Sequence, residues 1–174
     1  IIRHSAYFTL FCYNDEITVR PSIAFAMRVL NDFGTSALNK LLASVKTTEG
    51  SSCSSITNDG QIYYIDPNTD TNVSLDIKNK NFDIQFRVTE GANITDRSDN
   101  LIIFENSAKG LATEININDI STESFDKRFF VIGGTNFESK DIHETPIGSQ
   151  HGAYLILNAI ESALNIQNPY QSHA

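Results

Sequence analysis

Tryptophan is absent from this sequence, methionine occurs once, and no long apolar run is present. A membrane-spanning helix needs roughly 18 to 20 consecutive apolar residues, and no window of the chain approaches that length, so no membrane span is expected in it. The two cysteines, Cys12 and Cys53, lack the second pair that would complete a zinc site. They can form one disulfide or remain two thiols, because the sequence does not fix the distance between their Cα atoms.

Basic residues are also scarce, with 13 lysines and arginines against 21 aspartates and glutamates, and the net charge is −8. Nucleic acids and anionic lipids attract proteins through clustered lysine and arginine, so neither is expected as a partner. The 174 residues suffice for one hydrophobic core but are few for two, and we expect residues 1–174 to form a single domain. The start of the chain lacks an initiator methionine and a signal peptide, so we expect it to be a piece of a longer protein.

The first third of the chain predicts a β-hairpin followed by two helices. An aromatic-rich run over 6–13 and an alternating run over 16–20 flank the turn signal Asn14-Asp15. Pro21 then suits the first position of a helix that Gly34 ends, and leucines at helical spacing predict a second helix directly afterwards, with Thr35 or Ser36 as its N-cap. The serine-rich stretch 47–55 carries little apolar surface and predicts a mobile surface loop.

The rest of the chain predicts strands and one final helix. Strands are expected over 61–65, 73–77, 82–88 and 101–104, and the apolar run 129–132 is typical of a buried central strand. A loop is expected from Thr135 to His151. A helix should follow from Gly152, with its apolar face formed by Ile156, Leu157, Ile160, Ala163 and Leu164. The fold class expected is α/β in the broad sense (mixed α+β), with a mixed sheet flanked by helices and a C-terminal strand-loop-helix unit.

The C-terminal third resembles the CHASE domain of type two, a sensing domain of bacterial receptors. In that family a strand ends in an Ile-Gly pair, and an aspartate and a Thr-Pro-small-Gly turn precede a glycine-initiated helix that carries Asn-Ala-hydrophobic. The matching segments here are Arg128 to Thr135, Asp141, Thr145-Pro146-Ile147-Gly148, Gly152 and Asn158-Ala159-Ile160. Order and spacing both agree with the family.

The N-terminal region is also similar to the middle of that family, where an arginine-bearing strand leads to a Pro-Ser-hydrophobic-Ala helix, as in Ile2-Arg3 and then 21–26. Two features depart from the family. Ile156 stands where the family often has a histidine, while His151 lies just before the helix. The family's N-terminal half has no counterpart ahead of Ile1, so the chain is expected to be the C-terminal part of a larger sensor region.

The resemblance implies an extracytoplasmic, periplasmic sensor of a bacterial membrane receptor rather than an enzyme, with no cofactor. Its partners would be an unknown small-molecule or protein signal, a second copy of the chain in a homodimer, and an output domain of the same chain reached through transmembrane helices. That output would be a histidine kinase, a nucleotide cyclase or a protein kinase. The candidate ligand-binding residues are Gly133, Gly134, Thr135, Asp141, Thr145, Gly148, His151, Gly152 and Asn158.

Other interpretations of these residues stay open. Gly133-Gly134-Thr135 could cradle an anion or form a tight turn, and it lacks the lysine of a phosphate-binding loop. Asp141, His143, Glu144 and His151 are metal-ligating types, but their spacing matches no metal motif, and hydrogen bonds that fix a loop are the alternative. A periplasmic hydrolase or metal-dependent enzyme using the loop from Asp141 to His151, with Ser149 as nucleophile, is one rival function, although the nucleophile-elbow motif is absent. The other is a dimerisation or interaction module without a small ligand.

Overall fold

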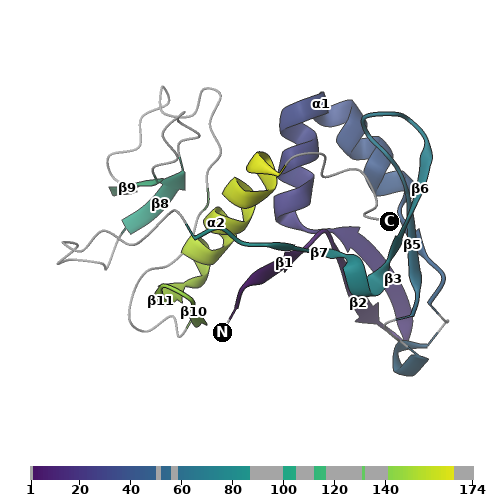
Figure 1. Ribbon diagram of the computed structural model, residues 1–174, viewed down its shortest axis with the longest axis horizontal. Coiled ribbons are helices and arrows are strands. Elements are labelled where there is room, and N and C mark those ends of the chain that lie inside the picture. Colours follow the sequence, from purple (N-terminus) through teal and green to yellow (C-terminus); the bar gives the residue numbers. More distant parts are fainter. Residues whose placement is uncertain are drawn as a thin grey trace. The chain divides into compact units, whose positions relative to one another are not determined.

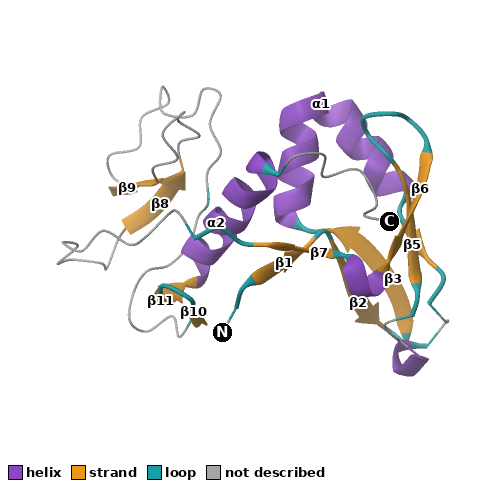
Figure 2. Cartoon of the chain, viewed as in Figure 1, coloured by secondary structure: helices purple, strands orange, loops and turns teal. Residues whose placement is uncertain are grey.

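The fold is known from a computed structural model, which describes residues 2–49, 52–55, 59–86, 100–104, 112–116, 131 and 141–166. It contains helices and small antiparallel sheets (Figures 1 and 2), and this confirms the mixed α+β class. The chain groups into two compact units. The first unit comprises His4–Asp83 and Ser162–Ala174, and the second comprises Ile1–Arg3 and Ile84–Glu161. No helix in the described part of the chain is long and apolar enough to cross a membrane.

The first unit opens with two antiparallel strand pairs. Strand β1 (His4–Ala6) pairs with β7 (Asn81–Asp83), and β2 (Phe8–Tyr13) pairs with β3 (Glu16–Pro21). The turn between β2 and β3 contains two residues, Asn14 and Asp15, with φ of 50° and 61°. Positive φ at both positions gives the twist that a two-residue hairpin needs, and asparagine and aspartate tolerate it better than most residues. The predicted hairpin is therefore confirmed.

Helix α1 (Ile23–Ser44) contains both predicted helices, with a break at Gly34, where φ is 80° and ψ is −177°. This backbone conformation favours glycine, because a Cβ atom is strained at such φ. The start of the helix differs from the prediction. Pro21 is the last residue of β3, and the Ser22 hydroxyl caps the helix by accepting a hydrogen bond from the Phe25 N–H at 3.2 Å.

A three-stranded antiparallel sheet follows, composed of β4 (Lys46–Thr47), β5 (Gln61–Ile65) and β6 (Asn72–Asp76). Short 3₁₀ helices, η1 (Cys53–Ser55) and η2 (Ile77–Asn79), complete the unit. The loop predicted over 47–55 is confirmed only in part, since Thr48, Glu49 and Ser52 lie outside helices and strands whereas residues at both ends do not. Thr47 belongs to β4, and Cys53 forms a disulfide with Cys12, with the two Cα atoms 5.7 Å apart. The disulfide is one of the two alternatives that the sequence left open for these cysteines, and Cys12 lies on a strand 41 residues before Cys53.

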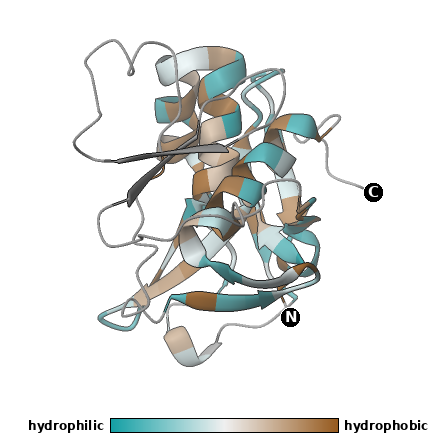
Figure 3. Ribbon diagram, turned by 90° about the vertical axis from the view of Figure 1, so that its left-hand side faces the viewer, coloured by the Kyte–Doolittle hydropathy of each residue, from teal (hydrophilic) through white to brown (hydrophobic). Residues whose placement is uncertain are grey.

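Aromatic rings form the centre of the first unit. Phe8 lies 5.4 Å from Phe25 and 5.0 Å from Tyr64 between ring centroids, and Tyr7 makes similar contacts with Phe25 and Phe82. All five side chains are buried, and tilted or edge-to-face packing at these distances adds to the stabilisation from buried area. Figure 3 colours the ribbon by hydropathy, and apolar residues in brown alternate with polar residues in teal along helices and strands. Burial also raises the pKa of the Tyr64 hydroxyl, with smaller contributions from Asp66 and Tyr7.

The second unit contains two more antiparallel strand pairs. Strand β8 (Asn100–Phe104) pairs with β9 (Ala112–Asn116), which confirms the strand predicted over 101–104. Strand β10 (Ile142–Thr145) pairs with β11 (Gly148–His151), so the region predicted as a loop contains a hairpin. Helix α2 (Gly152–Asn165) then begins at the predicted glycine, and its last turn belongs to the first unit.

Helix α2 buries a wider surface than its apolar pattern predicts. Leu157, Ile160 and Ala163 are buried as expected, but Ile156 is 37% exposed. The buried positions of the helix also include the polar residues Asn158, Glu161 and Ser162. The end of the helix is capped from α1: one Arg28 guanidinium nitrogen donates to the carbonyls of Ala163 at 2.9 Å, Leu164 and Ile166 at 3.2 Å. A cation at a helix C-terminus satisfies carbonyls that have no partner within the helix.

Two strand predictions differ from the structure. The strand predicted over 82–88 is confined to β7, since residues 84–86 are outside any strand and 87–88 lie outside the described residues. Of the run 129–132 only Val131 is described, and it is not in a strand. The strands form five small antiparallel sheets within the described residues, and no parallel pair occurs among them.

Candidate functional site

The turn of the β10–β11 hairpin explains three of the residues predicted as ligand-binding or turn-forming. Thr145 lies opposite Gly148, and Pro146 and Ile147 form the two-residue turn between them. The Thr145 hydroxyl donates to the Gly148 carbonyl at 2.6 Å and accepts from the Ile147 N–H at 3.3 Å. Gly148 has φ of 106°, which a side chain would strain. Thr145, Pro146 and Gly148 therefore hold the hairpin closed.

Asp141 and Gly152 meet where the hairpin joins helix α2. The Gly152 N–H donates to the Asp141 carbonyl at 2.9 Å, and the Asp141 carboxylate lies in the space that a Cβ atom on residue 152 would occupy. The same carboxylate bonds His143 Nε2 at 2.8 Å. The Asp141 carboxylate therefore contacts a histidine side chain, and the bond from residue 141 to the backbone of the helix start comes from its main-chain carbonyl.

Two more of the predicted residues, His151 and Asn158, are buried. His151 is 5% exposed and Asn158 is 0% exposed, and the Asn158 amide donates to the Tyr154 carbonyl one turn earlier at 2.9 Å. The Ser149 hydroxyl donates to the Glu144 carboxylate at 2.6 Å. The three residues Gly133, Gly134 and Thr135 lie outside the described residues. Within the described ranges no group of three or more metal-ligating side chains occurs. The ligand-binding role of these nine residues stays a prediction.

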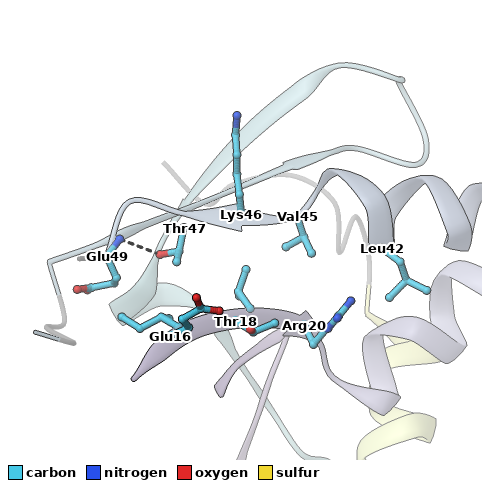
Figure 4. A pocket seen from close by; sticks show the side chains of 10 residues that line it. Glu16, Thr18, Arg20, Leu42, Val45, Lys46, Thr47 and Glu49 are labelled. Atoms are coloured by element: carbon cyan, nitrogen blue, oxygen red, sulfur yellow. Dashed lines mark hydrogen bonds between the residues drawn. The ribbon is translucent and has the colours of Figure 1, made fainter. Parts of the chain in front are cut away.

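A cavity of about 500 Å³ lies in the first unit, between strand β3 and the chain segment that follows helix α1 (Figure 4). Small-molecule sites commonly have volumes of about 300–1,000 Å³. Its lining residues are Glu16, Ile17, Thr18, Val19, Arg20, Leu42, Val45, Lys46, Thr47 and Glu49. We call this cavity the β3–β4 groove. None of its residues was predicted to be functional.

Four charged residues line the groove, Glu16, Arg20, Lys46 and Glu49, and the side chain of Lys46 points away from β3 (Figure 4). Figure 4 shows Glu16 and Glu49 toward one end and Arg20 toward the other, with the side chains of Glu16, Thr18 and Arg20 rising from β3 toward the opposite wall. The side chains of Glu16 and Arg20 make no ion pair or hydrogen bond within the described part of the chain. The groove therefore offers an acidic end and a basic end to a ligand.

The wall opposite β3 is fixed at both of its ends. At one end, Val45 follows α1 directly, and its N–H donates to the Leu41 carbonyl at 3.1 Å. At the other, the Cys12–Cys53 disulfide and Asp15, which accepts from the Cys53 N–H at 2.9 Å, attach η1 to the β2–β3 hairpin. The disulfide thus connects the segment beyond one wall of the groove to the hairpin that forms the other.

A second cavity of about 320 Å³ lies in the same unit, next to the middle of α1. Its two charged lining residues, Lys40 and Asp70, form an ion pair with each other. A ligand would have to compete with this pair, so the β3–β4 groove is the stronger candidate site.

Comparisons with known proteins find no relative. No family model matches the chain, and neither a curated protein nor a solved structure matches it. The resemblance to the CHASE domain of type two therefore rests on the motifs described above.

Proposed function

We propose that this chain is the extracytoplasmic sensing domain of a bacterial transmembrane receptor, and that it receives its signal in the β3–β4 groove. The Cys12–Cys53 disulfide is the observation that carries this proposal. Disulfides form and persist in oxidising compartments such as the periplasm and are rare in the cytosol. The bridge lies next to the groove, because Cys12 pairs with Ile17 of β3 and Ile17 lines the groove.

The bridge also contributes to the shape of the groove. Closing a loop of 41 residues stabilises a folded chain by about 4 kcal/mol in the chain-entropy model. Because η1 is tied to the β2–β3 hairpin, the two walls of the groove cannot separate freely at that end. A site shaped in this way binds a ligand at a lower entropic cost than a site that must first be ordered.

Signalling requires that the ligand bind one state of the receptor better than another. The two walls come from different elements, a hairpin strand and the segment after α1, so a ligand that contacts both would favour the arrangement in which they are held together. Output would pass to a cytoplasmic domain of the same chain through transmembrane helices, as the family resemblance implies.

Thiol trapping in intact cells tests the compartment. Cells that produce the complete natural receptor are lysed in acid and treated with a maleimide-polyethylene glycol reagent, with and without prior reduction. Cys12 and Cys53 should react only after reduction, and a Cys12→Ser variant should expose one reactive thiol without reduction. Two reactive thiols in the untreated natural chain would contradict an extracytoplasmic location.

A further inference from the structure

One face of the β2–β3 hairpin carries two exposed aromatic rings. Tyr13 is 75% exposed and Phe11 is 53% exposed, and both belong to β2. They lie two residues apart, so their side chains project from the same face of the strand. The opposite face of β2 contains Phe8, which is completely buried in the core of the first unit. Two neighbouring aromatic rings in contact with water are typical of a binding surface.

The same face contains side chains that line the β3–β4 groove. Tyr13 lies opposite Glu16, and Phe11 lies opposite Thr18. Side chains that are opposite each other in an antiparallel pair share a face, with their Cβ atoms about 4.5–5.5 Å apart. Glu16, Thr18 and Arg20 line the groove, and Figure 4 shows their side chains pointing toward its opposite wall. We call these five residues the hairpin face, and a ligand that lies over it needs no space between β3 and β4.

The polar groups of the hairpin face have no partners of their own. The side chains of Tyr13, Glu16, Thr18 and Arg20 make no hydrogen bond or ion pair with any residue that the structure describes. They offer a carboxylate that accepts hydrogen bonds, a guanidinium that donates them, and hydroxyls that do both. The charges of Glu16 and Arg20 are opposite and equal, so the hairpin face has no net charge. This set of groups suits a neutral ligand that is rich in hydroxyl groups.

A chain of sugar rings combines the two properties that the hairpin face requires. The C–H groups on the face of a pyranose ring carry a small positive charge, which the negative face of an aromatic ring attracts. The sugar hydroxyls lie around the rim of the ring, where they can donate and accept hydrogen bonds. The Cα atoms of Phe11 and Tyr13 are about 7 Å apart at ~3.3 Å per residue, so their rings form a row along the strand. An extended row of sugar rings, as in a β-linked chain, matches it better than a coiled α-linked chain.

We propose that the hairpin face binds a neutral, β-linked oligosaccharide. The sugar rings stack on Tyr13 and Phe11, and the sugar hydroxyls form hydrogen bonds with Glu16, Thr18 and Arg20. Because these last three residues line the β3–β4 groove, the bound chain also reaches the proposed sensing site. This inference rests on the proposed function, since it names the ligand class of that site.

Isothermal titration calorimetry of the oxidised chain tests this proposal with two β-linked probes, cellotetraose and tetra-N-acetylchitotetraose. At least one of them should bind. Maltotetraose, the α-linked isomer of cellotetraose, should bind at least about tenfold more weakly than the better probe, because its coiled chain cannot stack on both aromatic rings.

Variants of the hairpin face make the test specific. Tyr13→Ala and Phe11→Ala should each weaken binding of the better probe about tenfold, whereas Tyr13→Phe keeps the ring and should retain most of the affinity. Arg20→Ala should also weaken binding, because the sugar hydroxyls lose a donor. Phe33→Ala removes an exposed aromatic side chain of α1, outside the hairpin face, and should leave binding unchanged.

Three results would overturn the oligosaccharide assignment. One is that neither β-linked probe binds to a chain whose far-ultraviolet spectrum and disulfide are intact. Another is binding that Tyr13→Ala and Phe11→Ala leave unchanged. The third is a dimer, detected by sedimentation, that Tyr13→Ala dissociates, because a second copy of the chain would then cover the aromatic rings.

Failure of the oligosaccharide assignment can be told apart from failure of the proposed function. If a ligand of another class raises the melting temperature and requires Arg20, the sensing function stands and the oligosaccharide assignment fails. Free thiols in the trapping experiment would instead contradict the sensing function itself.

Discussion

Gly152 and Asp141 are in a close contact that a Cβ atom at position 152 would displace. The Gly152 N–H donates to the Asp141 carbonyl at 2.9 Å, and the Asp141 carboxylate lies where a Cβ atom would stand. This contact joins the β10–β11 hairpin to the first turn of α2. The presence of Asp141 before the hairpin and of Gly152 at the helix start is thus explained by packing. Both residues belong to the motif that carries the family resemblance.

Gly152→Ala should destabilise the chain by about 1–3 kcal/mol, because the added methyl group overlaps the Asp141 carboxylate. Chemical denaturation followed by circular dichroism measures the free energy of unfolding. In an Asp141→Ala background the same substitution should cost less, since the overlapping group is gone. Equal costs in both backgrounds would show that the contact is not the cause.

Removing the disulfide should lower the free energy of unfolding and loosen the segment next to the groove. The Cys12→Ser, Cys53→Ser double variant should lose about 2–4 kcal/mol of unfolding free energy. A reducing agent should lower the melting temperature of the natural chain but not that of the double variant. If the double variant melted at the temperature of the oxidised chain, the bridge would have no role in holding the unit together.

Arg28→Met should destabilise the first unit by about 1–3 kcal/mol, because the carbonyls at the end of α2 lose a charged donor. Arg28→Lys should recover only part of this loss, since an ammonium cannot reproduce the planar fork of the guanidinium. Urea denaturation of the three proteins provides the comparison. Full recovery by lysine would indicate that charge alone, and not geometry, caps the helix.

Alkaline pH should destabilise the fold through Tyr64. Burial raises the pKa of its hydroxyl above the ordinary value of 10.0, so the unfolded chain releases this proton at a pH where the folded chain retains it. Stability must then fall as pH rises above about 10, because the unfolded state binds fewer protons than the folded state there. Tyr64→Phe should flatten this dependence above pH 10, and Tyr63→Phe serves as the control. An unchanged slope in Tyr64→Phe would contradict the raised pKa.

The elements predicted well are those with a local and repeated signal. The β2–β3 hairpin follows from alternation around Asn14-Asp15, and the break in α1 follows from Gly34. The β10–β11 hairpin was missed because its strands have four residues each and carry polar side chains at most positions, which resembles a loop.

The candidate site was harder to predict because it has no contiguous motif. The β3–β4 groove combines β3 with residues after α1, so its two walls are separated in the sequence by the whole of that helix. Sequence reasoning placed function at Asp141, Thr145 and Gly148 because of their motif, and these residues make local hydrogen bonds that hold a hairpin and a helix start. The alternation of Glu16, Thr18 and Arg20 was read only as a strand, although it was the one local signal of a charged edge.

The central claim is that the β3–β4 groove receives a ligand, and a thermal-shift screen tests it most directly. The purified, oxidised chain is screened against oligosaccharides and periplasmic small molecules, together with its Arg20→Ala and Lys40→Ala variants. A ligand that binds the native state adds about 2.7 kcal/mol to the free energy of unfolding when its concentration is a hundredfold above its dissociation constant. This added stability raises the melting temperature. We predict a selective shift that Lys40→Ala retains and Arg20→Ala loses. A shift that survives Arg20→Ala unchanged would contradict the account.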